Sequence, residues 1–221
     1  MNKMDHTHKT IVLEQKSNGM PIQVTIIKDT AFSARMRLGP VIFNVLPQIV
    51  IWTEDSLGQL METVYITGAD FKKMRHAGKN KKGALFFSEC FPVWASRVKA
   101  AGKELPSKEK PYTDAVTSAT PQSSFTVQTR LRQAVKPYAF FAEINKSGDL
   151  NAVYNKENND WVGQPSIVYS VKVPEIQPGL VCSLHSVGHG GKIQDPPAIY
   201  SDLSDFDTAL KQVRAIAITF Q

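Results

Sequence analysis

Residues 114–121, with the sequence DAVTSATP, place one carboxylate and three hydroxyl groups in a short segment. The segment shows neither helical period nor strand alternation, and it follows a stretch from Lys103 that contains Pro106 and Pro111. We therefore expect the end of a long loop, and long loops in compact proteins often carry function. A hydroxyl there can be presented to another enzyme; the alternative is a turn in which Asp114 and the hydroxyls bond nearby backbone N–H groups.

The segment resembles the sequence that FMN transferases recognise when they attach FMN to exported flavoproteins. The resemblance is carried by Asp114, Ala115, Thr117, Ala119 and Thr120, while Ser118 stands where glycine is more usual. In that family the final threonine is esterified through the FMN phosphate. The resemblance therefore implies covalent FMN on Thr120, a flavin-attachment site formed by Asp114, Thr117, Ser118 and Thr120, and an FMN transferase as partner.

A wider stretch, which includes PQIVIWTEDSLGQLMETVYIT at residues 47–67, is similar to an uncharacterised family of predicted periplasmic proteins. Members of that family are associated with exported flavinylation and with PepSY-type membrane redox systems. The resemblance implies a periplasmic, non-enzymatic accessory protein with a membrane redox protein as partner, and it supplies no catalytic residues. The first residues contain no apolar leader segment, so export would require that a leader has been removed.

A second candidate site is CSLHSVGHGG, with Cys182, His185 and His189. Thiolate and imidazole are ligands that suit copper, and the spacing resembles the copper loop of cupredoxins. The upstream histidine and the axial methionine of that family have no counterpart at the corresponding positions. The alternative, which we favour, is a strand that ends in a glycine-rich turn.

The net charge of +6 is concentrated in one part of the chain, because residues 71–110 contain eleven Lys or Arg and three Glu. This basic segment is either a solvated loop and helix face or a docking surface for an anionic partner. Nucleic acid is not expected, because the lysines lack interleaved aromatic residues and accompany no nucleic-acid-binding motif. No window approaches the roughly 18 apolar residues of a membrane span, so we expect no transmembrane segment.

The two cysteines, Cys90 and Cys182, allow either one disulfide or two free thiols. No CxxC pair occurs, which argues against a zinc ribbon or a dithiol redox centre.

Alternating apolar and polar residues dominate the rest of the chain. The clearest run is FTVQTRLR, in which Phe125, Val127, Thr129 and Leu131 share one face. Seven further runs predict strands at residues 21–28, 47–54, 59–67, 136–144, 165–173, 179–186 and 213–220. Short links predict hairpins at residues 49–67 and around Ser147 and Gly148.

Only residues 91–102 read convincingly as a helix, with Pro92 suited to its first turn and Gly102 to its end. A shorter helical turn is expected within residues 205–213. We therefore predict an all-β protein, an antiparallel Ig-like β-sandwich that forms a single domain over residues 1–221, with a short helical insertion and a long basic loop at about 71–113. The expected function is that of an accessory protein of a flavin-linked redox system; the alternatives are a binding or assembly sandwich that docks a partner through the basic segment, and a metal-binding sandwich.

Overall fold

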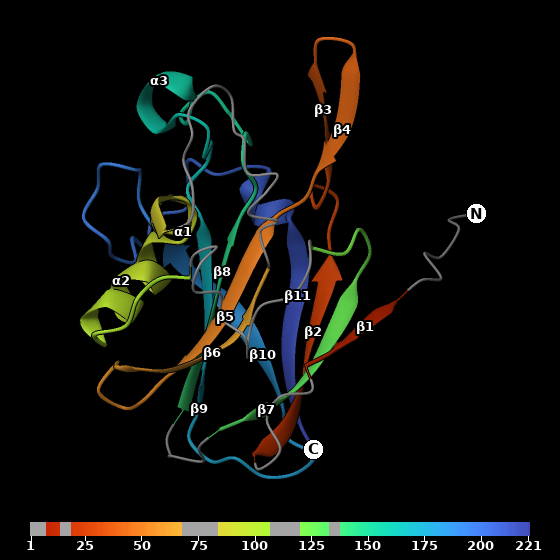
Figure 1. The fold of residues 1–221 in the computed structure, drawn as a ribbon, viewed down its shortest axis with the longest axis vertical. Helices are drawn as coiled ribbons and strands as arrows, with labels where there is room; N and C mark the ends of the chain where they lie inside the picture. Colours follow the sequence, from red (N-terminus) through yellow and green to blue (C-terminus); the bar gives the residue numbers. More distant parts are fainter. Residues whose placement is uncertain (1–7, 14–18, 68–83, 107–119, 133–137) are drawn as a thin grey trace.

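One nine-stranded sheet runs through the protein, whose structure is a computed structural model describing residues 8–13, 19–67, 84–106, 120–132 and 138–221 (Figure 1). Neighbouring strands are antiparallel, except that the first strand of the chain pairs in parallel with β7. In spatial order the strands are β1 (Lys9–Val12), β7 (Phe125–Leu131), β2 (Met20–Lys28), β11 (Val213–Phe220), β10 (Val181–His189), β9 (Ile167–Val173), β8 (Tyr138–Asn145), β5 (Gln48–Glu54) and β6 (Leu60–Ile66).

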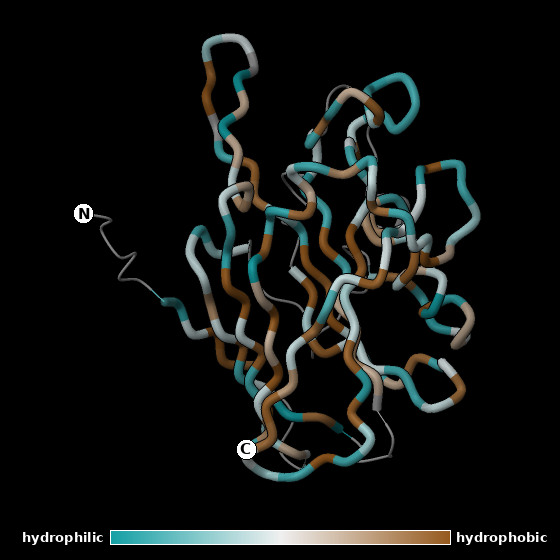
Figure 2. Tube along the Cα trace, turned by 180° about the vertical axis from the view of Figure 1, so that it is seen from behind, coloured by the Kyte–Doolittle hydropathy of each residue, from teal (hydrophilic) through white to brown (hydrophobic). Residues whose placement is uncertain are grey.

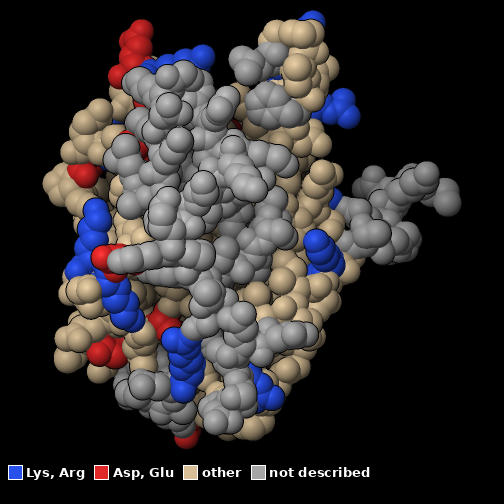
Figure 3. Space-filling model, in the orientation of Figure 1, with Lys and Arg blue, Asp and Glu red and all other residues tan. Residues whose placement is uncertain are grey.

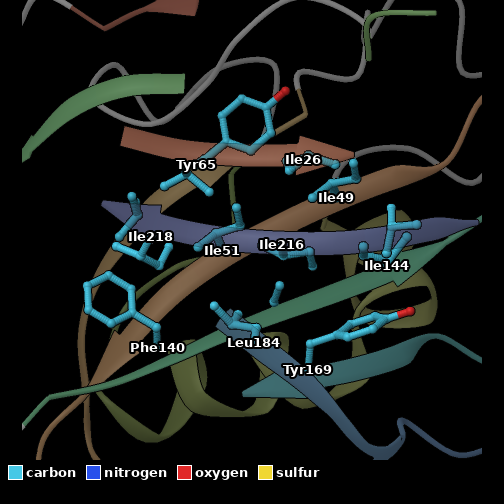
Figure 4. Close-up of a cluster of buried hydrophobic side chains, with 14 of the residues drawn as sticks. Ile26, Ile49, Ile51, Tyr65, Phe140, Ile144, Tyr169, Leu184, Ile216 and Ile218 are labelled. Atoms are coloured by element: carbon cyan, nitrogen blue, oxygen red, sulfur yellow. The ribbon is translucent and has the colours of Figure 1, made fainter. Parts of the chain in front are cut away.

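The sheet folds over so that its two halves face each other, with β10 shared between them. Tyr65 on β6 and Phe125 on β7 come from opposite ends of the strand order, yet their ring centroids lie 6.0 Å apart. Phe140 on β8 and Phe220 on β11 make a second ring contact between the halves at 5.8 Å. Figure 4 shows how apolar side chains from both halves converge on one core. The prediction of an all-β, antiparallel sandwich is confirmed.

A second apolar cluster lies on the outer face of β5, under the helices α1 (Ala84–Cys90) and α2 (Pro92–Ala100). Alternation along β5 sends Ile49 and Ile51 to the core between the halves, and Val50 and Trp52 to the helices. This strand is therefore buried on both faces, which explains its almost continuous apolar sequence.

The predicted helix is confirmed as α2. Pro92 occupies its first turn, and Gly102 follows its end with a φ of 67°, a conformation that favours glycine. Trp94 and Val98 are buried on the face that packs against the sheet. The short helical turn expected before the last strand is a 3₁₀ turn, η1, at Ala209–Lys211.

The hairpin at residues 49–67 is confirmed by the pairing of β5 with β6, but the one expected around Ser147 and Gly148 is wrong. Strands β8 and β9 do pair, yet residues 146–166 connect them through a long excursion that includes α3 (Lys156–Asn159). The chain does not return directly from β8 to β9, because Asp149 is bound by Thr208 and Gln212, which precede β11.

A separate two-stranded hairpin, β3 (Ala34–Leu38) and β4 (Val41–Val45), projects from one end of the sandwich (Figure 1). Among the described strands it pairs with no other strand, and the sequence analysis did not anticipate it. None of the helices in the described ranges is long and apolar enough to cross a membrane.

Candidate functional site

Thr120 is the one residue of the flavin-attachment site that the structure describes; Asp114, Thr117 and Ser118 lie outside the described residues. Thr120 is buried, and its hydroxyl donates a hydrogen bond of 2.6 Å to the carbonyl oxygen of Pro47. Pro47 lies between β4 and β5, and Thr120 lies shortly before β7. The hydroxyl thus links two segments that are distant in sequence.

This arrangement sets a condition for chemistry at Thr120. An oxygen that is to bond to phosphorus must leave the Pro47 carbonyl and become accessible to another enzyme. A hydrogen bond of this kind contributes about 1 kcal/mol to stability. The structure therefore holds the hydroxyl in a closed position, and opening it requires both the loss of this hydrogen bond and the exposure of a buried side chain.

The three candidate metal ligands do not converge. Cys182 is half-buried against the core between the sheet halves, whereas His185 is exposed on the same strand. Residues three positions apart on a strand point to opposite faces, so the spacing separates these two side chains. Within the described ranges, no group of three or more His, Cys, Asp or Glu side chains could hold a metal ion.

His189 has a different role, because it fixes the glycine-rich turn that follows β10. Its ring stacks on Tyr200 with centroids 5.3 Å apart and lies 4.8 Å from the ring of Phe206. Its Nδ1 atom accepts the backbone N–H of Gly191 at 3.1 Å. Burial lowers the pKa of His189, against the opposing effect of Asp195 and other nearby aspartates.

The glycines of this turn are required by close approach, as expected for a strand that ends in a glycine-rich turn. A Cβ atom at Gly190 would lie 2.5 Å from the Ser166 hydroxyl and 2.8 Å from a carboxylate oxygen of Glu143. Gly191 adopts a φ of 81°. Any larger side chain at Gly190 would displace Ser166 or Glu143.

Both cysteines are free thiols. Cys90 belongs to the cluster under the helices, and Cys182 packs against the core between the sheet halves. Burial raises the pKa of Cys90 well above its usual range, and nearby Glu89 adds to this effect. Burial also raises the pKa of Cys182. Neither thiol is therefore primed as a nucleophile.

Of the cations in the basic segment, the structure describes Arg97, Lys99 and Lys103. The Nε atom of Arg97 lies 3.0 Å from a carboxylate oxygen of the buried Glu54, which also accepts the indole N–H of Trp52 at 2.8 Å. Lys99 and Lys103 are exposed. The lysine-rich stretch at residues 72–82 lies outside the described residues.

Sequence reasoning missed Glu143, a fully buried carboxylate at the amino end of α2. It accepts the backbone N–H of Trp94 at 2.9 Å and of Val93 at 3.3 Å, and the hydroxyl of Ser166 at 2.6 Å. Burial raises its pKa from 4.5 to about 7, although these hydrogen bonds act in the opposite direction. An acidic residue within the otherwise apolar run YAFFAEI was the available signal.

A second buried polar group, centred on Asp149, was also missed. Its carboxylate accepts the Thr208 hydroxyl at 2.7 Å and the Gln212 amide at 3.0 Å, and lies 3.6 Å from the Lys146 ammonium. The Lys146 Nζ atom also donates to the carbonyl oxygen of Ala31 at 2.6 Å. These bonds connect the loops at one end of the sandwich to one another.

Comparisons with models of protein families, with curated proteins and with solved structures found no match.

Proposed function

We propose that this protein is a periplasmic, non-catalytic accessory protein of a flavin-linked redox system, and that it carries FMN as a phosphoester on Thr120. The observation that supports the proposal is the FMN-transferase-like motif of residues 114–120, which ends at Thr120; in the structure the hydroxyl of this buried threonine donates to the carbonyl oxygen of Pro47. Its partners would be an FMN transferase and a membrane redox protein.

In the attachment step, the Thr120 oxygen would form a bond to the phosphorus of an activated flavin donor, lose its proton, and displace the remainder of that donor. Opening costs at least the roughly 1 kcal/mol of this hydrogen bond, because Thr120 is also buried, so at most about one molecule in six has the hydroxyl released. A transferase that binds only this open form would draw the population towards it. Attachment therefore requires a local opening near Pro47 and leaves the sandwich intact.

The test is co-expression with an exported FMN transferase, followed by denaturing electrophoresis and flavin fluorescence. Thr120→Ser keeps the hydroxyl and should remain fluorescent, whereas Thr120→Val should be dark. Ser118→Gly, which restores the commoner motif, should label at least as well as the wild type. A dark wild-type band, beside a fluorescent control substrate, would refute the attachment.

A second candidate function is favoured by the excess of positive charge in residues 71–110, which contain eleven Lys or Arg and three Glu. On this hypothesis Thr120 is a turn residue, and the protein is a binding or assembly sandwich that docks an anionic partner through residues 71–110. Changing Lys79, Lys81 and Lys82 to Gln should then slow association more than it speeds dissociation, because long-range attraction acts mainly on encounter. An association rate unchanged by these substitutions would refute this role.

A further inference from the structure

The β3–β4 hairpin exposes apolar side chains on both of its faces. The exposed fractions are 38% for Met36, 59% for Val41 and 65% for Ile42. Arg37 lies directly opposite Ile42 in the register, so these two share one face, while their sequence neighbours Met36 and Val41 share the other. Figure 2 shows apolar stretches along this projection.

The charges on the hairpin have one sign. From Thr30 to Thr53 the sequence contains no acidic residue, and its only charged residues are Arg35 and Arg37. Both arginines are exposed. Figure 3 shows the projection as mostly uncharged surface with blue side chains and no red ones on the visible face.

We propose that the tip of the β3–β4 hairpin inserts shallowly into the surface of a membrane that contains anionic lipids. The lipid phosphates would bind Arg35 and Arg37, and the acyl boundary would receive Val41 and Ile42. Shallow insertion of this kind gains free energy from two sources, the burial of apolar surface and the electrostatic attraction to anionic lipids. Each of these contributions is weak by itself.

A membrane fits the hairpin better than a protein surface does. A flat protein partner would cover one face, whereas lipid surrounds an inserted tip and so covers Val41 and Ile42 together. A second copy of the chain that bound through the same hairpin would bring its own Arg35 and Arg37 close to those of the first, and like charges would oppose that contact. Anionic lipid offers the complementary charge.

The backbone limits how deep the tip can insert. Among the described strands β3 and β4 pair only with each other, and open sheet edges are not tolerated in hydrocarbon. At the turn itself the cost of burying backbone groups in hydrocarbon is smaller. Pro40 has no N–H, and the carbonyl oxygen of Gly39 accepts the Nε–H of Arg37 at 3.0 Å. Insertion is therefore confined to the turn and the first residues beside it.

The base of the hairpin is fixed to the sandwich, so the tip can be presented in a defined direction. Before β3, the carbonyl oxygen of Ala31 accepts a hydrogen bond from Lys146. After β4, in the protein without FMN, the carbonyl oxygen of Pro47 accepts the hydroxyl of Thr120. Met36 also packs on the body, because a Cβ atom at Gly148 would lie 3.2 Å from its terminal methyl group.

The test is co-sedimentation of the full chain with phosphatidylcholine vesicles that contain phosphatidylglycerol, with pure phosphatidylcholine vesicles for comparison. The pair Val41→Ser and Ile42→Ser, made together, should weaken binding roughly tenfold without changing charge. Each of Arg35→Gln and Arg37→Gln should weaken it about fivefold. Matched controls are Val181→Ser, at a valine that is also 59% exposed, and Arg214→Gln, at another exposed arginine.

The proposal is supported if the hairpin variants lose vesicle binding while the controls keep it and all of them unfold at the wild-type temperature. It is overturned if the wild type does not bind the anionic vesicles, or if the hairpin variants bind as tightly as the controls, since the lipid would then contact another basic surface. Self-association of the wild type that Val41→Ser and Ile42→Ser abolish, without vesicle binding, would also overturn it and identify an interface between copies. These experiments use the protein without FMN, so none of their results bears on flavin attachment to Thr120, and the two proposals can fail separately.

Discussion

At the scale of single residues, Glu143 is a buried acid whose protonation should be visible in the stability of the protein. Its pKa is raised from 4.5 to about 7 in the folded state, so the folded state binds the proton more tightly than the unfolded chain does. The contribution of Glu143 to stability is therefore full below about pH 4.5 and is lost as the pH rises through about 7.

We predict that Glu143→Gln flattens this dependence. Between about pH 5 and about pH 8 the free energy of unfolding of the wild type should fall by roughly 2–3 kcal/mol more than that of the variant. Urea unfolding across this range measures the difference, with the exposed Glu157→Gln as control. Parallel curves for wild type and Glu143→Gln would show that Glu143 titrates normally.

The Thr120 hydroxyl should contribute to stability through its bond to Pro47. Thr120→Val removes the hydroxyl and keeps the shape, so we expect a loss of about 1 kcal/mol. Thr129→Val is the matched control, because Thr129 is also buried but its hydroxyl has no hydrogen-bond partner among the described residues. Chemical denaturation of both variants should show a loss at Thr120 and none at Thr129; equal effects would contradict a stabilising bond.

The sequence indicates Thr120 as a candidate but not its burial. Its partner, Pro47, lies 73 residues away, and no local pattern links the two positions. The burial of Glu143 likewise could not be predicted from a local pattern, because its hydrogen-bond donors come from α2 and from Ser166. Alternation does correctly separate Cys182 from His185, because a strand places positions three apart on opposite faces.

At the scale of elements, α2 is attached to the sheet through Glu54. Arg97→Met removes the charged partner of a buried carboxylate and should cost about 1–2 kcal/mol, because Arg97 itself is partly exposed. Lys99→Met is the control on the same helix, at an exposed position with a similar helix propensity. In thermal unfolding, Arg97→Met should have a lower midpoint than Lys99→Met. Equal midpoints would show that the ion pair contributes little.

Elements with one buried face follow directly from their sequence period. The strand β7 buries Phe125, Val127, Thr129 and Leu131 as its alternation predicts, and β11 has the predicted bounds. Strand β5 was predicted almost at its observed bounds, but the hairpin β3–β4 was missed, because β3 and β4 are only five residues long and only Leu46 and Pro47 separate β4 from β5.

At the scale of the whole molecule, the order of the strands decides which groups can meet. That order depends on long-range pairs, such as β2 with β11, which a sequence period does not encode. It places Cys90 under the helices and Cys182 against the core between the sheet halves, so the two thiols belong to separate clusters.

We therefore predict two free thiols under denaturing, non-reducing conditions. In the native protein Cys182 should react with a thiol reagent well before Cys90, which is fully buried and should react only when the protein unfolds. Mass spectrometry of the labelled protein over time gives both rates. A disulfide, or equal labelling rates, would contradict this arrangement of the layers.

The proposed attachment of FMN to Thr120 can be tested by the intact mass of the protein exported by cells that contain an active FMN transferase. We predict a mass increase of one FMN on the wild-type chain, located on the peptide that contains Thr120 and absent from Thr120→Val. An unmodified wild-type mass, from cells whose transferase labels a control substrate, would contradict the claim and leave Thr120 as a turn residue bound to Pro47.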